Sequence, residues 1–385
     1  MNIFIQALFL CLVVPLAGHA EGLLAVDNPA KNGEGLTAYG SFDAFEGNDQ
    51  VAMREYGRGW RGAYSPRNGN NLGLLSFRTE AGVQSRGYRF GGLYRAEALV
   101  QANRDTSDLA HQNKNRTGYD IGRTYSLDYR MRGYEVDGAR LSKSFELALS
   151  GPWQVNWGLG LAYLRGKRIK LETASGHVVT LNTKDFNADA IRSNTNSKMD
   201  VTNLATFNPP FGRVYAPSAE GYALDVGMVL RHPDSGVSLE LAVADLAGRM
   251  DWKNLPNNVT DYNTATKYFD ADGYVHFTPL ATRTSSYRNV RQNLDPKLWL
   301  AANYPISDFA FQGAASYQRG YWFPQVGIKY RIDPRWNINA DYDFYFNTLG
   351  LSLQNQWFYI GLRTDSVNLA KAKAYGLNAG LNIAF

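Results

Sequence analysis

The sequence predicts an all-β protein built as a single antiparallel β-barrel of the transmembrane type, with about 14 strands within a range of roughly 12 to 16. Three observations lead to this fold class. The chain opens with a short apolar segment, apolar and polar residues alternate along many later runs, and the last strand ends in Phe385. No internal repeat or low-complexity linker divides the chain, so we expect one domain.

Length and composition agree with a barrel. The 385 residues could form more than one soluble domain or a single large all-β unit. Charged residues make up 19% and aromatic residues 13% of the chain, whereas soluble domains average about 25% charged residues. The mean hydropathy of −0.35 excludes a helical membrane protein. It does not exclude a barrel, because only alternate strand residues face lipid.

The charge distribution argues against nucleic acid as a partner. The net charge is only +5, with 40 Lys and Arg interspersed among 35 Asp and Glu. No basic run interleaved with aromatic residues provides the pattern that a nucleic-acid interface needs.

Residues 1–20 have the features of a secretory signal peptide. An apolar run from Ile3 to Leu16 precedes Gly18-His19-Ala20, which places small residues before a cut after Ala20. The alternative is a membrane anchor helix, but the run falls short of the ~20 residues that a spanning helix needs. Since the only cysteine, Cys11, lies in this segment, the mature chain would carry no disulfide.

The strands are predicted from alternation with a period of two. In residues 153–163 the apolar face carries Trp153, Trp157 and Tyr163, and the opposite face is small or polar. The run 335–347 alternates over about twelve residues, which suits a transmembrane strand better than the usual five or six. Similar runs cover 125–132, 222–230, 237–243 and 326–332.

Two long polar stretches, 182–217 and 247–293, interrupt the alternation. Connections of this length are usually functional or disordered, and we expect them to be surface loops or folds into the lumen. Residues 21–34 precede the first clear strand and could form a small plug, so the barrel itself is expected over 35–385.

The last strand indicates where the protein resides. Its apolar face carries Tyr375, Leu377, Leu381, Ile383 and Phe385, and the opposite face is small or polar. It resembles the terminal strand of bacterial outer-membrane proteins, and the resemblance implies these five residues as the signal read by the barrel-assembly machinery. It also implies the cell outer membrane of a Gram-negative bacterium, with membrane lipid as the surroundings. The alternative is a soluble strand that ends in Phe by chance.

A hairpin formed by residues 221–227 and 238–246 resembles those of fatty-acid-transporter-like (FadL-like) barrels, a group that includes conjugation- and secretion-associated outer-membrane proteins. The resemblance implies about 14 strands, an N-terminal plug, and diffusion of hydrophobic or small molecules. Asn28-Pro29-Ala30 stands a few residues inside the expected mature N-terminus rather than at it, so no substrate is assigned.

Residues for catalysis or metal binding are not predicted. His111, His177, His232 and His276 have no metal-ligand spacing and no recognisable Ser partner. We therefore expect no catalytic residue, metal or cofactor. By elimination, the functional candidates are charged side chains expected to face the lumen, where rings of charge set selectivity. The alternative for each is that it only solvates the lumen through ion pairs. These candidates are Arg89, Arg95, Glu97, Asp128, Arg130, Asp225, Glu240, Lys329, Arg331, Asp341 and Asp343.

Three hypotheses of function follow. The first is an outer-membrane channel or transporter for small molecules, hydrophobic ones among them, whose identity the sequence does not name. The second is an adhesin, a receptor, or the outer-membrane partner of a secretion or conjugation apparatus, because of the two long polar stretches. The third is an outer-membrane hydrolase, which would need a Ser/His or Asp/His pair at the rim. Oligomeric state is not predicted.

The expected topology contains one conflict. Three strand-like runs, at 335–346, 350–362 and 374–385, follow the tight turn at 333–335. With Phe385 at the periplasmic end, three strands would place that turn outside the cell, whereas short turns are usually periplasmic.

Overall fold

The computed structural model describes residues 22–385, apart from 57–58, 148–150, 183–185, 199–216, 265–266, 270, 273–274 and 278–280. The expected signal peptide, residues 1–20, therefore lies outside the described residues. No helix among the described residues has the length and apolarity needed to cross a membrane.

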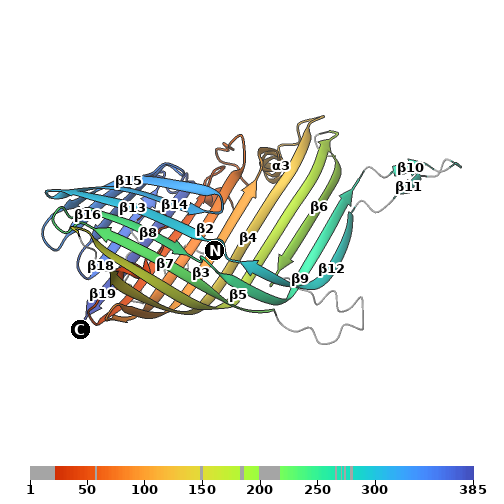
Figure 1. Ribbon diagram of the computed structural model, residues 1–385. Helices are drawn as coiled ribbons and strands as arrows, with labels where there is room; N and C mark the ends of the chain where they lie inside the picture. Colours follow the sequence, from red (N-terminus) through yellow and green to blue (C-terminus); the bar gives the residue numbers. More distant parts are fainter. Residues whose placement is uncertain are drawn as a thin grey trace.

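The described residues are predominantly β-structure (Figure 1). The helical elements are short: η1 (Pro29–Lys31), α2 (Met53–Tyr56) and α3 (Arg104–Asn115). The strands are β1 (Thr37–Asn48), β2 (Asn71–Ser85), β3 (Tyr88–Ala102), β4 (Thr124–Leu147), β5 (Gln154–Thr180), β6 (Phe186–Asn196), β7 (Ser218–Arg231), β8 (Ser238–Ala244), β9 (Arg249–Asn263), β10 (Lys267–Phe269), β11 (Val275–Phe277), β12 (Ala281–Asn293), β13 (Lys297–Ile306), β14 (Phe309–Gln318), β15 (Tyr321–Arg331), β16 (Asn337–Asp343), β17 (Thr348–Gln354), β18 (Phe358–Thr364) and β19 (Ala374–Ala384).

The described strands, apart from the hairpin β10–β11, form one 17-stranded antiparallel sheet that closes on itself. Sixteen of them complete the circuit, in the order β1 to β6, β9, β7, β8, β13 to β19 and back to β1. The seventeenth, β12, pairs only with β9 among the described strands. The fold class is confirmed, but the expected count of about 14 is wrong.

The additional strands come from the two stretches that were expected to be loops. β6 lies in 182–217, and β9 and β12 lie in 247–293. β5 pairs with β7 up to Arg165 and with β6 from Lys170 onward, so β6 and β9 enter the sheet where β5 and β7 diverge. Figure 1 shows β4, β5 and β6 extending past the shorter strands on the other side of the barrel. β6 and β12 carry polar residues on both faces, which is why their period of two could not be recognised. β9 differs, because it buries Met250, Trp252 and Leu255 on one face.

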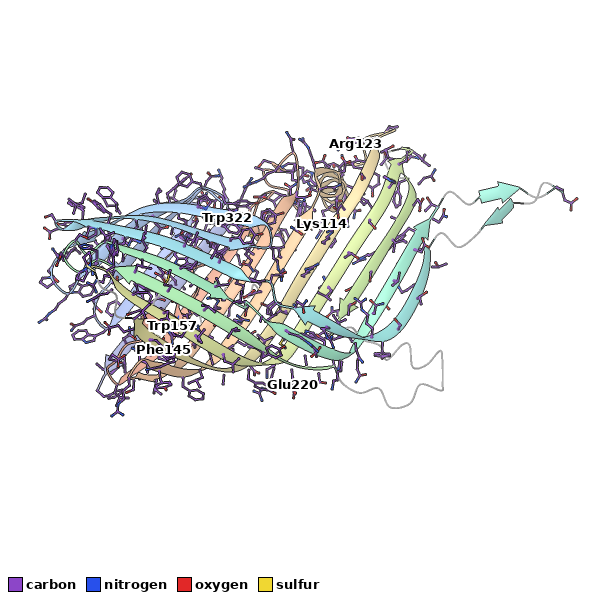
Figure 2. The ribbon with its side chains drawn as sticks, viewed as in Figure 1. Lys114, Arg123, Phe145, Trp157, Glu220 and Trp322 are labelled. Atoms are coloured by element: carbon purple, nitrogen blue, oxygen red, sulfur yellow. The ribbon has the colours of Figure 1, made fainter. Side chains whose placement is uncertain are left out.

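The outer face of the barrel carries an apolar band. On β5, Trp157, Leu159, Leu161 and Tyr163 are exposed and alternate with buried or small residues. Phe145 of β4 stacks on Trp157 with ring centroids 4.4 Å apart, and Figure 2 shows the two rings together on one side of the molecule. A closed barrel that leaves such side chains without a protein partner has the surface of a membrane-spanning barrel. The alternation predicted for 153–163 is therefore confirmed.

β19 closes the barrel by pairing with β18 on one edge and β1 on the other. The backbone N–H of Phe385 donates to the carbonyl of Leu36 at 3.0 Å. Four strands, not three, follow the turn at 333–335, because the run 350–362 breaks at Asn355 into β17 and β18. That turn and Phe385 therefore lie at the same end, which resolves the topological conflict. The role of β19 in assembly stays a prediction.

The run 335–347 forms a shorter strand than expected. β16 ends at Asp343, whose carboxylate accepts the backbone N–H groups of Tyr345 and Phe346 at 3.3 and 2.8 Å. The chain turns there, and Phe346 packs in the interior beside Phe45, not on the outer face. Asp343 was expected to be a lumen selectivity residue, but in the structure its carboxylate caps this turn.

Candidate functional site

The N-terminal segment, residues 22–34, lies inside the barrel. Its Leu23 carbonyl accepts hydrogen bonds from Ser316 of β14 and Gln325 of β15, at 3.2 and 3.0 Å. The carbonyl of Ala25 accepts from Arg78 of β2 at 3.3 Å. The Asn28 amide donates to backbone carbonyls of β7 and β8. Since these strands lie on different sides of a closed circuit, a short segment that reaches all of them must run through the interior.

Asp27 anchors this segment to a buried ionic cluster. Its carboxylate lies 2.9 Å from Arg140 and 3.6 Å from Arg89. Arg140 also contacts Glu80 at 3.3 Å and Asp225 at 3.0 Å, and Arg89 contacts Glu80 at 3.1 Å. Burial by itself would raise the pKa of the Asp27 carboxyl, but Arg89 and Arg140 outweigh it and hold the pKa below its ordinary value of 3.8. Asp27 is therefore charged and bound at neutral pH.

Asn28 fixes the turn that follows. Its side-chain oxygen accepts the N–H of Ala30 at 3.0 Å, and Pro29 begins the 3-10 turn η1, as a cap and a first-turn proline favour. Its amide reaches the carbonyls of Met228 and Leu241, both at 3.3 Å, and Glu240 at 3.1 Å. Lys31 contacts the same Glu240 at 2.8 Å.

Two strand glycines make room for this turn. A Cβ atom on Gly227 of β7 would overlap the side-chain oxygen of Asn28, and one on Gly158 of β5 would overlap the backbone of Pro29. Only glycine allows the segment to lie this close to the barrel wall at these two positions.

A second buried ionic cluster lies beside the first. Asp245 receives a two-armed hydrogen bond from Arg95, at 3.0 Å, and lies 3.3 Å from Lys297. Lys297 also contacts Glu97, which accepts the Tyr134 hydroxyl at 2.8 Å. All four charged side chains are at least nine-tenths buried. Buried charges survive in a fold only when they are paired in this way.

The two clusters are joined through one hydrogen bond. The backbone N–H of Asp245 donates to Asp225, the partner of Arg140, at 3.0 Å. Asp245 adopts a left-handed backbone with φ of 58°, which orients both its N–H and its carboxylate into the network. A continuous chain of charge therefore crosses the interior from Lys297 to the Asp27 anchor.

On the side toward Phe385, the segment borders a cavity of about 400 Å³. Trp299 and Ala301 of β13 and Ala314 of β14 supply apolar walls, and Lys329 and Asp341 supply charge. The cavity reaches Asp308 and Arg331 at the rim, where the two side chains form an ion pair at 2.8 Å.

On the other side of the segment, the interior is apolar and aromatic. Leu23 and Leu24 pack against inward-facing residues of β1, β2, β3 and β15, which comprise Phe45, Leu72, Leu74, Leu99 and Phe323, together with Phe346 and Ala374. A water-filled porin has a polar interior instead. The segment thus lies between a packed apolar cluster and a mixed cavity.

Aromatic residues also gather at the mouth of the barrel that is farther from Phe385, beside α3. Tyr64 stacks on His111 of α3 with ring centroids 3.9 Å apart, and Trp60 lies next to both. Arg123 ties α3 to the top of β4 through Asp105 and Asp108, at 2.9 and 2.8 Å. Figure 2 shows Arg123 and Lys114 close to this helix, above the barrel wall.

The structure brings only some of the predicted lumen residues together. The network around the segment contains five of them: Arg89, Arg95, Glu97, Asp225 and Glu240. Lys329, Arg331 and Asp341 line the 400 Å³ cavity instead, and Asp341 is paired with Arg363. Asp128 and Arg130 pair with each other at 3.3 Å, are about half exposed, and lie on β4 apart from the network.

Sequence reasoning missed Asp27, Glu80, Arg140, Asp245 and Lys297. Glu80 and Arg140 stand in β2 and β4, where alternation could have identified them as inward-facing. Asp245 and Lys297 stand at strand ends, where alternation gives no orientation.

No group of three or more His, Cys, Asp or Glu side chains among the described residues is arranged to hold a metal ion. His111 contacts Tyr64 and Asn115, and His232 packs against Trp153 and accepts the backbone N–H of Ser235. The side chain of His276 lies outside the described residues, so the hydrolase hypothesis stays open.

No family model and no curated protein matches the chain. Solved structures do match over nearly the full length. A TodX deletion-mutant monoaromatic hydrocarbon channel is 11% identical, with 92% of each chain covered and a TM-score of 0.45. The P. putida toluene transporter TodX is 10% identical, with 93% of this chain and 91% of that chain covered and a TM-score of 0.43. A Pseudomonas aeruginosa FadL homologue is 10% identical, with 92% of each chain covered and a TM-score of 0.35. The structural neighbours are therefore outer-membrane channels of the FadL-like kind, a likeness that concerns the fold alone.

Proposed function

We propose that this protein is an outer-membrane channel for small molecules of apolar character, and that residues 22–34 act as a plug that closes it. The observation that carries the proposal is the position of this segment, which is bonded to strands on opposite sides of the barrel, between a packed apolar cluster and a cavity. A segment held only to complete the core would not need a buried ionic anchor beside a cavity.

The chemistry of the interior favours an apolar solute. The interior around Leu24 is packed with Phe45, Phe323 and Phe346, and the mouth carries Trp60 and Tyr64. Transfer of a small apolar molecule from water to such surfaces is favourable, whereas a sugar or an ion would lose hydration there. The 400 Å³ cavity on the other side is large enough for a small solute.

The test is uptake of an apolar fluorescent dye by Gram-negative cells that produce the protein. We expect uptake to rise about threefold over cells without it, with no rise for a sugar of similar size, since only the apolar solute can partition into the aromatic mouth. Ala310 lines the cavity and lies on the inward-facing side of β14, as does Ser316, which contacts Leu23. Ala310→Trp should fill part of the cavity and abolish the rise. The matched control is Gly313→Trp, because Gly313 lies on the outward-facing side of the same strand. Equal uptake by Ala310→Trp and the unmodified protein would contradict this route.

Because Asp27 anchors the proposed plug, we expect the plug to keep the barrel closed in mild acid. Because the pKa of Asp27 in the folded protein is lowered below 3.8, its contribution to plug binding is complete above 3.8 and is lost only at still lower pH. In planar bilayers we expect the same low conductance from pH 8 to pH 5. Opening within that interval would show that another group controls the plug.

The receptor hypothesis keeps one supporting observation. The extension formed by β6, β9 and β12 projects beyond the rest of the barrel, and β12 pairs on one edge only among the described strands. An edge of this kind can accept a strand of another protein. The receptor hypothesis would be favoured if the protein showed no channel activity but this extension captured a specific partner. It would be removed if a variant lacking residues 264–293 captured that partner equally well.

A further inference from the structure

A groove runs along the outer face of β2 to β5, within the apolar band. It has a volume of about 530 Å³, and its floor consists of small residues, among them Ala81, Gly92 and Ala139. Tyr94 and Tyr163 form its sides. A Cβ on Gly92 would meet only a backbone oxygen, at 4.0 Å, so the space above this glycine is empty of protein. Most of its lining side chains are apolar, which suits a hydrocarbon chain.

A basic cleft continues from the end of this groove at which Arg165 lies. It has a volume of about 910 Å³ and is lined by strands β5, β7, β9 and β12. Its cationic side chains are Arg165, Lys167, Arg249, Lys253 and Arg291. Arg165 lines both the groove and the cleft, so the two are adjacent parts of one surface.

The carboxylates near the cleft do not neutralise it. Asp137 is shared by Arg165 at 3.0 Å and Lys167 at 2.7 Å. Asp251 is shared by Arg249 at 2.8 Å and Arg291 at 3.3 Å. Glu220, which Figure 2 shows at the lower edge of the barrel, is the third carboxylate. Five cations face three carboxylates, and Lys253 forms no ion pair with the described part of the chain.

The position of the cleft relative to the membrane is given by two tyrosines. Tyr163 and Tyr222 are paired across β5 and β7, and each is 50% exposed. Exposed tyrosines mark the boundary between the hydrocarbon region and the headgroups. The next outward positions are Arg165 and Glu220. The cleft therefore lies at headgroup level, at the end of the barrel away from Phe385.

We propose that the groove and the cleft together bind a phosphorylated glycolipid of the outer leaflet, of the lipid A type. An acyl chain would lie over Gly92 between Tyr94 and Tyr163. A phosphate would accept hydrogen bonds from Arg165 and Lys167, with Lys253 and Arg291 adding positive charge. This inference rests on the proposed outer-membrane location but not on channel activity.

The test is retention of lipid A by the purified full-length barrel, followed by native mass spectrometry after exchange into detergent. Arg165→Gln with Lys167→Gln should lower the bound fraction of lipid A about tenfold, since each cation near an anionic headgroup adds favourable electrostatic free energy to binding. Gly92→Leu should lower it as well, by filling the groove without altering any charge. The charge-matched control is Arg130→Gln with Arg283→Gln, two exposed residues outside the cleft.

Three further results decide the outcome. Dephosphorylated lipid A should bind at least tenfold more weakly than lipid A, and inorganic phosphate should not displace the lipid. The proposal would be overturned if dephosphorylated lipid A bound as tightly as lipid A. It would also be overturned if the control variant lost as much bound lipid as the variant of Arg165 and Lys167. Dye uptake by the cleft variants should match that of the unmodified protein, so failure of lipid binding and failure of the channel are separately visible.

Discussion

Substitution of Gly158 and Gly227 by Val should open the channel. In planar bilayers we expect the conductance of the double variant to exceed that of the unmodified protein by at least about tenfold and to approach that of a chain lacking residues 22–34. The added side chains would occupy the positions now held by Pro29 and Asn28.

The expected size follows from packing. Overpacking costs about 1 to 3 kcal/mol at each site, and 1.4 kcal/mol is a factor of ten in an equilibrium. Two clashes at the same turn total about 2 to 6 kcal/mol and therefore favour an open state by about 30-fold or more. The strands themselves should tolerate the change, because Val suits a β-strand better than Gly does.

Two measurements make this test specific. Gly313→Val is the matched control, because a Cβ at that strand position meets no atom within 4 Å; its conductance should stay low. Trypsin should cleave after Lys31 in the double variant but not in the closed protein, where residues 27–30 are held by the network. If the double variant stays closed while its N-terminus becomes accessible to trypsin, the segment is not the barrier and the plug proposal fails.

Substitution of Asp245 by Asn should destabilise the barrel by about 3 to 5 kcal/mol. Asn keeps the size of the side chain and tolerates the left-handed backbone at this position, where φ is 58°. It removes the negative charge that Arg95 and Lys297 share, and leaves both cations buried with less compensation. The loss should appear as a lower urea midpoint, followed by tryptophan fluorescence in lipid vesicles.

The control is the same change at an exposed ion pair. Asp308→Asn breaks the contact with Arg331, whose side chain is more than half exposed, and should alter stability by less than about 1 kcal/mol. Equal effects of the two substitutions would mean that the buried network contributes no more than a surface pair does.

The sequence predicted the architecture where the physical signal is strong. Lipid on one side of a strand and the lumen on the other impose opposite demands on successive residues, so 153–163 could be recognised as a strand without coordinates. The same reasoning failed for β6 and β12, because these strands project beyond the apolar band and carry polar residues on both faces. It also missed β9, although Met250 and Trp252 alternate there with charged residues and are buried. It also did not show the turn at Asp343, since alternation alone does not show where a chain turns; a role of Asp343 in selectivity stays a prediction.

The inward orientation of Arg89, Arg95, Glu97, Asp225 and Glu240 likewise followed from the sequence alone. The partners of these residues could not be predicted. Asp27, Arg140, Asp245 and Lys297 come from other strands, a strand end or the N-terminal segment, and only closure of the barrel brings them within contact distance. The sequence by itself determined a barrel with a charged interior. The tertiary structure decided that residues 22–34 enter it, because closure brings two strand glycines and an arginine cluster to the same place in the lumen.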